Sequence, residues 1–259
     1  MRQLVINADD FGFTRDVNAG IVHAHREGVL TSTTLMANGD AFEDAVRLAR
    51  ETPTLDVGCH LVLVQGRSLI TGRAFPETPR EVVAALVRRH LDVYAELRAQ
   101  IEKILAAGIT PSHLDSHKHT HIVPSVFKVV IRLAQEFRIP FVRLPLDRTA
   151  PYAKFPCAVA DPLYRRTGQR VDVRMTDHFI GFRLTGTLNE QSFASALGTL
   201  EQGSTEFMCH PGYLGSELRN APTRLKEARV RELEALTSFR IREVLNETGI
   251  RLATFRTLS

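Results

Sequence analysis

The feature that most limits the possible folds is a regular alternation of short apolar segments with longer amphipathic ones along nearly the whole 259-residue chain. The apolar segments have the length and composition of buried strands, and the amphipathic segments repeat apolar residues at helical spacing. The expected strands lie at residues 4–7, 32–37, 56–63, 113–121, 141–145, 176–182, 205–211 and 252–255. The expected helices lie at residues 14–27, 40–50, 80–107, 124–137, 189–200 and 223–246.

Strands and helices that alternate in this way predict a parallel sheet with right-handed crossover connections. Seven or eight such units in a chain of this length fit an α/β fold of the (β/α) barrel type better than an open sheet. We therefore expect a TIM-like barrel, regular or irregular, that forms one domain over residues 1–259. Residues 147–174 lack the pattern and are expected to form an excursion from this scaffold, with room for one short helix.

The composition argues against several classes of protein. The formal charge is +4, but Lys and Arg are scattered without a dense basic stripe, so nucleic acid is not an expected partner. The three cysteines form no CxxC motif and no disulfide framework, which favours a reducing cytoplasm. We find no signal-peptide pattern and no apolar run long enough to span a bilayer. We therefore expect a cytoplasmic protein with no transmembrane segment.

Histidine is concentrated at residues 113–121. Because side chains alternate along a strand, His113, Asp115, His117, His119 and His121 would all point to one face. Such a polar face is costly to bury unless it binds something, and nitrogen and oxygen ligands suit a metal ion. His117 is the first candidate ligand, Asp115 could orient a ligand histidine, and His119 and His121 could line the pocket. The alternative is a solvent-exposed edge strand with a non-specific metal-binding surface.

Further polar residues end other expected strands, and a barrel gathers those ends on one face. The pair Asp9 and Asp10 could divide the work between holding a cation and taking a proton; the alternative is a turn or a helix cap. His60 ends at the same face, although a lone strand histidine is more often a core residue. One aspartate with two histidines leaves coordination positions open, which suits a divalent ion in a hydrolytic site.

Four more residues are candidates for the same site. His210, from the other side of the ring, could protonate a leaving group, or it could simply pack in the core. Arg143, Asp177 and His178 could hold substrate or tune the other site residues through charge pairing. A structural salt bridge is the competing interpretation for these three.

These segments together resemble the YdjC-like carbohydrate deacetylases, a family with chitooligosaccharide deacetylases and deacetylase-like proteins of hopanoid biosynthesis. The matching segments are residues 7–12, 31–36, 58–61, 113–121, 143–145, 177–179 and 208–212, in the family's order. The resemblance implies a (β/α) barrel and one divalent metal ion, Mg²⁺ or Zn²⁺. By motif position it also implies that Asp10, His60 and His117 bind the metal, with Asp9 as the base and His210 as the acid.

The resemblance further implies removal of an N-acetyl group from an amino sugar in an oligosaccharide or glycolipid, with release of acetate. The chain departs from the chitooligosaccharide branch at residues 65–79 and 147–174, and residues 23–30 and 60–66 look more like the hopanoid-associated branch. The alternatives are a metal-dependent hydrolase of another amide or of a phosphoester, and a non-catalytic carbohydrate-binding protein. A homodimer would be a common state for such a protein.

Overall fold

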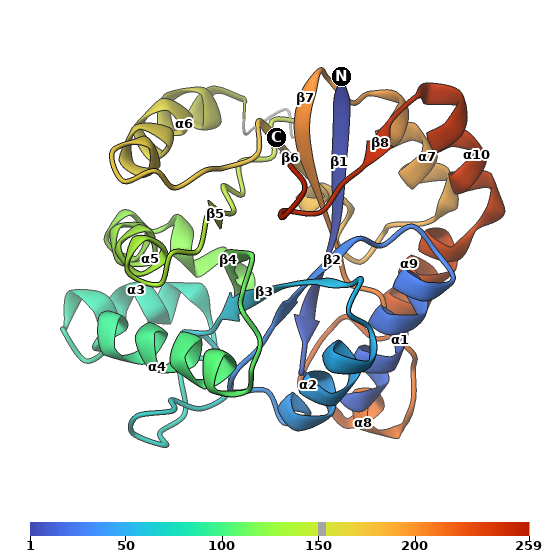
Figure 1. Cartoon of the computed structure of the whole chain (residues 1–259). Coiled ribbons are helices and arrows are strands. Elements are labelled where there is room, and N and C mark those ends of the chain that lie inside the picture. Colours follow the sequence, from blue (N-terminus) through green and yellow to red (C-terminus); the bar gives the residue numbers. More distant parts are fainter. Residues whose placement is uncertain (150–153, 259) are drawn as a thin grey trace.

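The computed structural model describes residues 1–149 and 154–258, the side chains of 154–159 excepted. Eight parallel strands form one curled sheet with helices around it (Figure 1). The strands are β1 (Arg2–Phe11), β2 (Ser32–Leu35), β3 (Asp56–Leu61), β4 (His113–Ser116), β5 (Phe141–Val142), β6 (His178–Ile180), β7 (Gly203–Cys209) and β8 (Arg251–Leu252). Their order is β5-β4-β3-β2-β1-β7-β6, with β8 paired to β1.

The sheet is a half-barrel whose two ends are β5 and β6. An isolated parallel bridge joins Phe141 of β5 to Arg174, just ahead of β6. There the amide of Val142 donates to the carbonyl of Arg174 at 3.0 Å, and the amide of Arg174 donates to the carbonyl of Pro140 at 2.8 Å. The prediction of a parallel (β/α) barrel is therefore confirmed in an irregular form.

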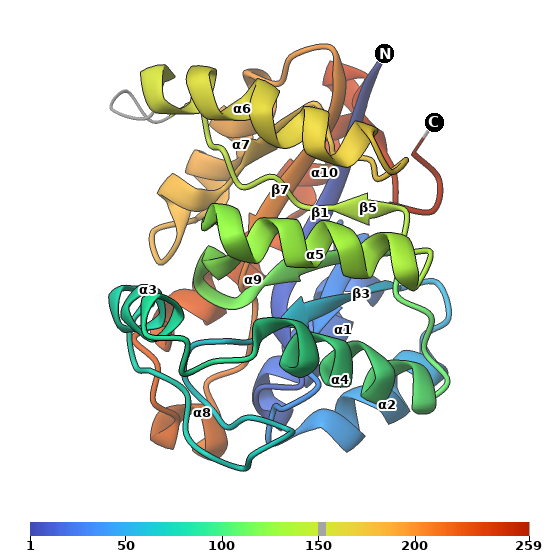
Figure 2. The same cartoon turned by 90° about the vertical axis from the view of Figure 1, so that its left-hand side faces the viewer.

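Helices cover the outer face of this sheet, with α3, α4, α5 and α6 stacked along one side (Figure 2). The helices are α1 (Arg15–Arg26), α2 (Phe42–Glu51), α3 (Pro79–Val87), α4 (Val93–Ala106), α5 (Pro124–Glu136), α6 (Lys154–Gln169), α7 (Glu190–Gly198), α8 (Ser216–Asn220), α9 (Glu227–Thr237) and α10 (Phe239–Thr248). Two 3₁₀ turns are η1 (His117–Ile122) and η2 (Phe182–Leu184).

Helix starts follow the capping residues in the sequence. The side chain of Thr14 accepts a hydrogen bond from the amide of Val17, and α1 begins directly after it. Asn189 forms a capping box with Ser192 at the start of α7. These side chains satisfy amides that the first helical turn leaves unpaired. Helix α2 differs, because its first residue follows Ala41, which makes no side-chain capping bond.

Two predicted long helices are wrong, since each is two helices. The helix expected at 80–107 is interrupted between α3 and α4, where Arg89 has a left-handed φ of 56°. The helix expected at 223–246 is interrupted at Ser238, whose extended backbone both ends α9 and begins α10. In the excursion, α6 spans 16 residues, longer than the short helix expected there, and residues 150–153 lie outside the described part.

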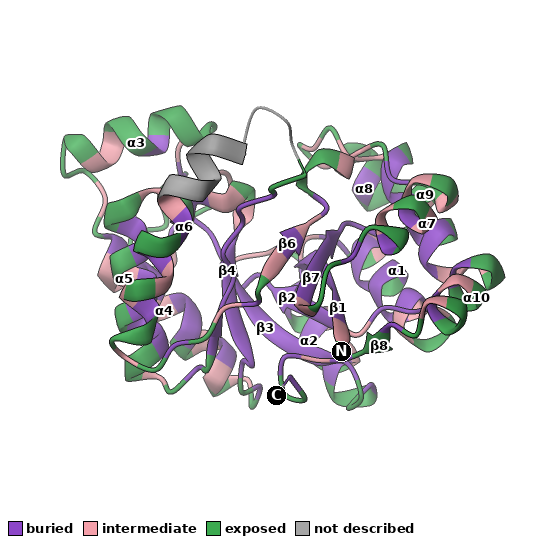
Figure 3. Cartoon of the chain, turned by 90° about the horizontal axis from the view of Figure 1, so that it is seen from above, coloured by how far each residue is buried: buried purple, intermediate pink, exposed green. Residues whose placement is uncertain are grey.

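Strand alternation separates an outer apolar layer from the barrel interior. Leu4, Ile6 and Ala8 of β1 belong to the main hydrophobic core, as do Cys59 and Cys209. Both cysteines are buried and free. Seen along the barrel, buried residues follow the strands and exposed ones the outer helix surfaces (Figure 3). No helix among the described residues has both the length and the apolar composition needed to cross a membrane.

The carboxyl-terminal segment of the chain fills the barrel interior at the amino-terminal ends of the strands. Phe255, 2% exposed, stacks on His113 with ring centroids 3.7 Å apart and lies 5.4 Å from the ring of Phe141. It belongs to a second apolar cluster that consists of Val5, Phe141, Ala253, Phe255 and Leu258. The interior is thus apolar at this end, and its polar groups lie nearer the carboxyl ends of the strands.

This packing predicts that Phe255→Ala lowers the free energy of unfolding by about 3–5 kcal/mol, because it empties a filled site in the barrel. Phe239→Ala is the control, since Phe239 is 72% exposed and its loss should change stability by less than about 0.5 kcal/mol. Urea unfolding of both variants measures the difference. An equal loss of stability in the two variants would contradict the role of Phe255 in filling the barrel interior.

Candidate metal centre and active site

The pocket begins where β1 loses its regular geometry. The register between β1 and β2 shifts between Ala8 and Phe11, and Asp10 has a left-handed φ of 71°. In a regular strand, neighbouring side chains point to opposite faces, but this irregularity lets Asp9 and Asp10 both line one cavity. The side chain of Asn18 holds the following turn, because its Oδ1 accepts from the amide of Gly12 at 2.6 Å.

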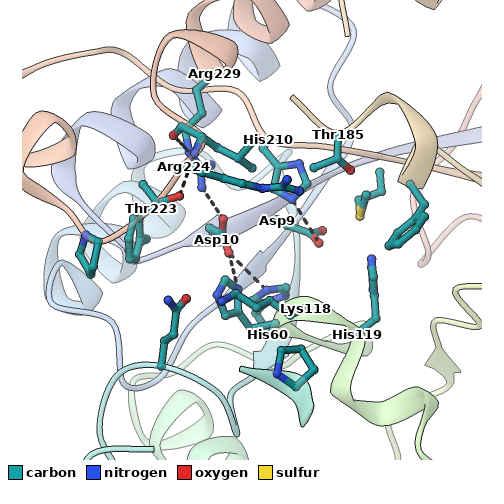
Figure 4. Close-up of a pocket in the computed structure, with 18 residues that line it drawn as sticks. Asp9, Asp10, His60, Lys118, His119, Thr185, His210, Thr223, Arg224 and Arg229 are labelled. Carbon is teal, nitrogen blue, oxygen red and sulfur yellow. Dashed lines mark hydrogen bonds and ion pairs between the residues drawn. The ribbon is translucent and has the colours of Figure 1, made fainter. Parts of the chain in front are cut away.

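Asp10, His60 and His117 converge in this cavity. Their potential ligand atoms all lie within 4.8 Å of one another. Oδ1 of Asp10 is 3.0 Å from Nδ1 of His117. It is 3.4 Å from Nε2 of His60 (Figure 4). Nε2 of His60 is buried and has no hydrogen-bond partner among the described residues. A buried nitrogen without a partner, aimed at a carboxylate and a second imidazole, fits a metal site.

Asp115 orients His60 for this role. Its Oδ1 lies 2.7 Å from Nδ1 of His60, and its Oδ2 accepts from the hydroxyl of Thr34 at 3.0 Å. This contact on Nδ1 turns Nε2 toward Asp10, as carboxylates behind metal-ligating histidines do. Burial alone would lower the pKa of His60, but the carboxylates of Asp115 and Asp10 raise it to about 10. The site therefore favours a positive charge at this position.

A second cluster of possible ligands, Asp9, His60 and Asp115, already has a cation beside it. Arg143 is fully buried, and its Nη1 and Nη2 bind the two oxygens of Asp9 at 2.8 and 2.7 Å. The same guanidinium lies 2.8 Å from Asp115 and 2.7 Å from Glu206. Because Arg143 occupies the space between these carboxylates, the cluster that contains Asp10 is the better candidate for a metal.

The expected base and acid lie next to each other. Burial raises the pKa of Asp9, but the Arg143 guanidinium outweighs it and holds that pKa well below its ordinary value, so Asp9 is ionised near neutral pH. Oδ2 of Asp9 lies 4.0 Å from Nε2 of His210. Burial lowers the pKa of His210 to about 4, so its imidazole is neutral near pH 7. The amide of His210 donates to Glu232 at 2.5 Å.

The prediction that residues 113–121 form one strand with a single polar face is wrong. Strand β4 ends at Ser116, and the chain then turns through η1, where Lys118 and His119 have left-handed φ values of 50° and 53°. Such angles are costly for non-glycine residues and are found mainly where the surrounding structure enforces them. His117, the first residue of this turn, lies with its Nδ1 3.0 Å from Oδ1 of Asp10.

Two histidines of this segment are structural. His113 lies deep in the barrel, with Nε2 3.1 Å from the side-chain oxygen of Asn7. His121 was expected to line the pocket, but it is fully buried. Its Nδ1 lies 2.5 Å from the hydroxyl of Ser116, and its Nε2 donates to the carbonyl of Arg143 at 3.0 Å. It therefore joins the turn after β4 to the segment after β5.

His119 lines the cavity as expected, next to an aromatic side chain. Its ring lies 5.4 Å from that of Phe182, which also lines the cavity and is partly exposed. Two nearby aromatic residues are engaged elsewhere, because Phe179 is buried 5.5 Å from the Arg143 guanidinium and Tyr213 packs against His23. Phe182 is therefore an aromatic side chain that the cavity offers to a ligand.

Asp177 and His178 do not line this cavity, which corrects the expectation that they belong to the same site. They lie at the start of β6, at the opposite end from the pocket. Asp177 accepts hydrogen bonds from the amide and the hydroxyl of Ser204, and Nε2 of His178 donates to the carbonyl of Gln202. Both residues therefore hold β6 against the start of β7.

The cavity has a volume of about 540 Å³, within the range of small-molecule sites. It is lined by Asp9, Asp10, Phe13, His60, Gln65, Pro79, His117, Lys118, His119, Phe182, Thr185, Met208, His210, Pro222, Thr223, Arg224, Leu225 and Arg229. Figure 4 shows Asp10 near its centre, between Arg229 on one side and His60 on the other.

Sequence analysis missed several buried charged residues around this cavity. Nη2 of Arg229 donates to Oδ2 of Asp10 at 2.5 Å, and Glu232 and Glu206 bind His210 and Arg143. The sequence does contain a pattern that indicates Arg229 and Glu232. They lie three positions apart on the face of α9 that also carries Ala228, Leu233 and Leu236, where a charged residue needs a buried partner.

The chain is similar to known proteins over nearly its whole length. The chain matches the YdjC-like protein family over residues 3–247. It is 38% identical over 260 residues to a carbohydrate deacetylase of Geobacillus stearothermophilus, covering 98% of this chain and 97% of that protein. A carbohydrate deacetylase of Brevibacillus brevis is 37% identical over 99% of both. The crystal structure of a protein from Enterococcus faecalis V583 is similar in fold, with a TM-score of 0.82 at 27% identity and coverage of 99% and 98%.

The buried histidines predict how stability depends on pH. Burial, followed by the Arg143 guanidinium, lowers the pKa of His121 from 6.5 to about 3. Between these values the unfolded chain binds a proton that the folded chain does not, so this residue makes stability fall as the pH falls from about 6.5 to about 3. We expect His121→Gln to reduce that slope by up to about 1.4 kcal/mol per pH unit.

Urea unfolding between pH 3 and pH 7 measures this slope. His90→Gln is the control, because His90 is exposed, and it should leave the slope unchanged. An unaltered slope in His121→Gln would show that this histidine takes up its proton in the folded state as readily as in the unfolded chain.

Proposed function

We propose, on the premise that this chain belongs to the YdjC-like protein family, that it is a metal-dependent carbohydrate deacetylase. Two relatives that match almost its full length are carbohydrate deacetylases. The reaction removes the N-acetyl group of an amino sugar, in an oligosaccharide or a glycolipid, and releases acetate. The observation that carries the proposal is the convergence of Asp10, His60 and His117 in one cavity with Asp9 and His210.

The residues present fit a divalent metal ion. Asp10, His60 and His117 would hold it, with one carboxylate oxygen and two imidazole nitrogens as ligands. This donor set suits Zn²⁺ more than Mg²⁺, which prefers oxygen ligands. A bound divalent ion would supply Lewis acidity for the hydrolysis of the amide. The buried nitrogen of His60 without a partner supports this assignment.

Asp9 acts as the general base. Its carboxylate is ionised near neutral pH because the Arg143 guanidinium lowers its pKa, and it accepts a proton from the water that attacks the acetyl carbonyl. That water becomes more acidic as its oxygen bonds to the carbonyl carbon, so a weak base in the right position suffices. Arg143 holds both oxygens of Asp9, which fixes the direction of the transfer.

His210 acts as the general acid. Because its pKa is about 4 in the free protein, it is neutral near pH 7 and must first receive the proton that it donates. Oδ2 of Asp9, 4.0 Å from Nε2 of His210, lies beside it and can supply that proton. When the carbon–nitrogen bond breaks, the proton goes to the departing amine, and the acetyl group leaves as acetate.

The cavity offers contacts for a sugar next to this centre. Phe182 provides an exposed aromatic face, on which the apolar side of a sugar ring can stack. His119 adds a polar group beside that ring. Lys118 and Arg224, exposed residues that line the same cavity, provide hydrogen-bond donors.

Acetate release from a panel of N-acetylated mono- and oligosaccharides tests the reaction, with the protein loaded in turn with Zn²⁺ and Mg²⁺. We expect acetate and a free amino sugar in equal amounts. Aryl phosphates and other amides are tested in parallel. Turnover of those compounds instead would favour a different hydrolase, and tight sugar binding without acetate would favour a carbohydrate-binding protein.

Two substitutions separate the base from the metal ligands. Asp9→Asn should lower kcat by about 10²–10⁴-fold, because it removes the group that takes the proton, while metal binding persists. His117→Ala should lose the metal as well as the activity, because it removes one of three ligands. Calorimetric metal titration and acetate release measure both properties. An Asp9→Asn protein with the wild-type rate would overturn the assignment of the base.

A further inference from the structure

Helix α9 carries two charged side chains inside the protein, one turn apart. Arg229 and Glu232 are each 1% exposed. Burial of a charge is costly unless a partner compensates for it, so the partners show what these residues do. Both side chains reach across to strand ends that form the catalytic centre, Arg229 to the end of β1 and Glu232 to the end of β7.

Glu232 holds the main chain of His210. Its Oε2 accepts from the amide of His210 at 2.5 Å, and its Oε1 accepts from the amide of Gly186 at 3.4 Å. The amide of Gly212, two residues further on, donates to the carbonyl of Arg229 at 3.2 Å. Two hydrogen bonds thus join α9 to the segment that presents His210, and neither involves the imidazole nitrogens.

Arg229 holds the carboxylate of Asp10. Nη2 binds Oδ2 at 2.5 Å (Figure 4). This leaves Oδ1 toward His117 and His60. The arginine passes so close to Gly212 that a Cβ there would lie 3.2 Å from its Cδ. The glycine therefore gives the side chain room to reach β1.

Arg229 has a buried hydrogen-bond donor without a partner in the described part of the chain, and a contribution to stability does not explain why such a residue is present. Its Nη1 is buried and has no hydrogen-bond partner among the described residues. A buried donor without a partner destabilises the folded protein, so an apolar residue of similar size would be the more stabilising choice. An apolar residue could not make the contact with Asp10, and this contact is therefore the reason for an arginine at this position.

We propose that α9 is the positioning element of the catalytic centre, in which Arg229 orients Asp10 and Glu232 fixes the main chain of His210. The roles of Asp10 and His210 rest on the proposed function. Arg229 directs one carboxylate oxygen toward the two histidines, and Glu232 sets the imidazole of His210 against Asp9. Because one helix makes both contacts, it fixes the separation between the metal ligands and the acid. Arg229 and Glu232 are positioning residues.

Glu232 is tested with a truncation and a conservative replacement. Glu232→Ala removes the acceptor for the His210 amide and should lower kcat by about 100-fold with KM within about twofold, because a misplaced acid affects the chemical step more than substrate binding. Glu232→Gln keeps an acceptor oxygen and should restore most of the rate. Glu234→Ala, an exposed position on the same helix, is the matched control.

A second readout for Glu232 does not depend on turnover. NMR of the histidine ring protons follows the titration of His210, which should shift in Glu232→Ala and not in Glu234→Ala. The proposal is overturned if Glu232→Ala keeps kcat within twofold, or if Glu232→Gln is as impaired as Glu232→Ala. Urea unfolding of each variant shows that the measured protein is folded.

Arg229 is tested by its effect on metal binding. Calorimetric titration with Zn²⁺ should show affinity about 10–100-fold weaker in Arg229→Ala, the range expected when a group that orients a ligand is lost. Arg229→Lys should recover part of it, and Arg231→Ala, an exposed change on the same helix, should bind like the wild type. Affinity within twofold of wild type in Arg229→Ala would overturn the proposal.

These two arms separate a failure of this proposal from a failure of the proposed function. The metal titration and the His210 titration need no substrate. If the wild-type protein released no acetate from any sugar while both titrations changed as expected, the deacetylase reaction would be wrong and the positioning by α9 would stand. If acetate were released and neither titration changed, the deacetylase reaction would stand and the positioning by α9 would be wrong.

Discussion

One buried guanidinium holds the interior of this barrel together. Arg143 lies between Asp9, Asp115 and Glu206, at 2.7–2.8 Å from each. Three buried carboxylates so close together would repel one another strongly, and the removal of a buried partner typically costs about 3–5 kcal/mol. Through these contacts Arg143 keeps Asp9 ionised and oriented. Through Asp115 it also supports His60, the histidine whose Nε2 faces Asp10.

The candidate site needs backbone that a regular barrel does not provide. The irregularity at the end of β1 turns two consecutive aspartates into one cavity, with Asp10 in a left-handed conformation. The turn after β4, which begins at His117, uses the same region of backbone at Lys118 and His119. Strain of this kind persists where surrounding contacts enforce it, and the contacts of Asp10 with Arg229 and His117 are of that sort.

Much of the fold could be predicted from local patterns. The alternation of strands and helices led to the parallel barrel, and capping residues such as Thr14 marked helix starts. Three of the errors share one cause. Periodicity cannot detect a single residue that leaves its regular conformation, so it does not reveal the breaks at Arg89 and Ser238 or the turn at His117. The assignment of Asp177 to the site is wrong for another reason, because position along a short strand depends on the pairing partner of that strand.

The sequence by itself determined the class of fold and the residue types of the site, because hydrophobic periodicity and the choice of Asp and His are local properties of the chain. Only the tertiary structure decided which of those residues meet. His121 is buried and bonds to the carbonyl of Arg143. His117, only four positions away, is a candidate metal ligand. Arg229, from a distant helix, became the partner of Asp10. Such choices depend on contacts between strands and helices far apart in the chain, and no local pattern encodes them.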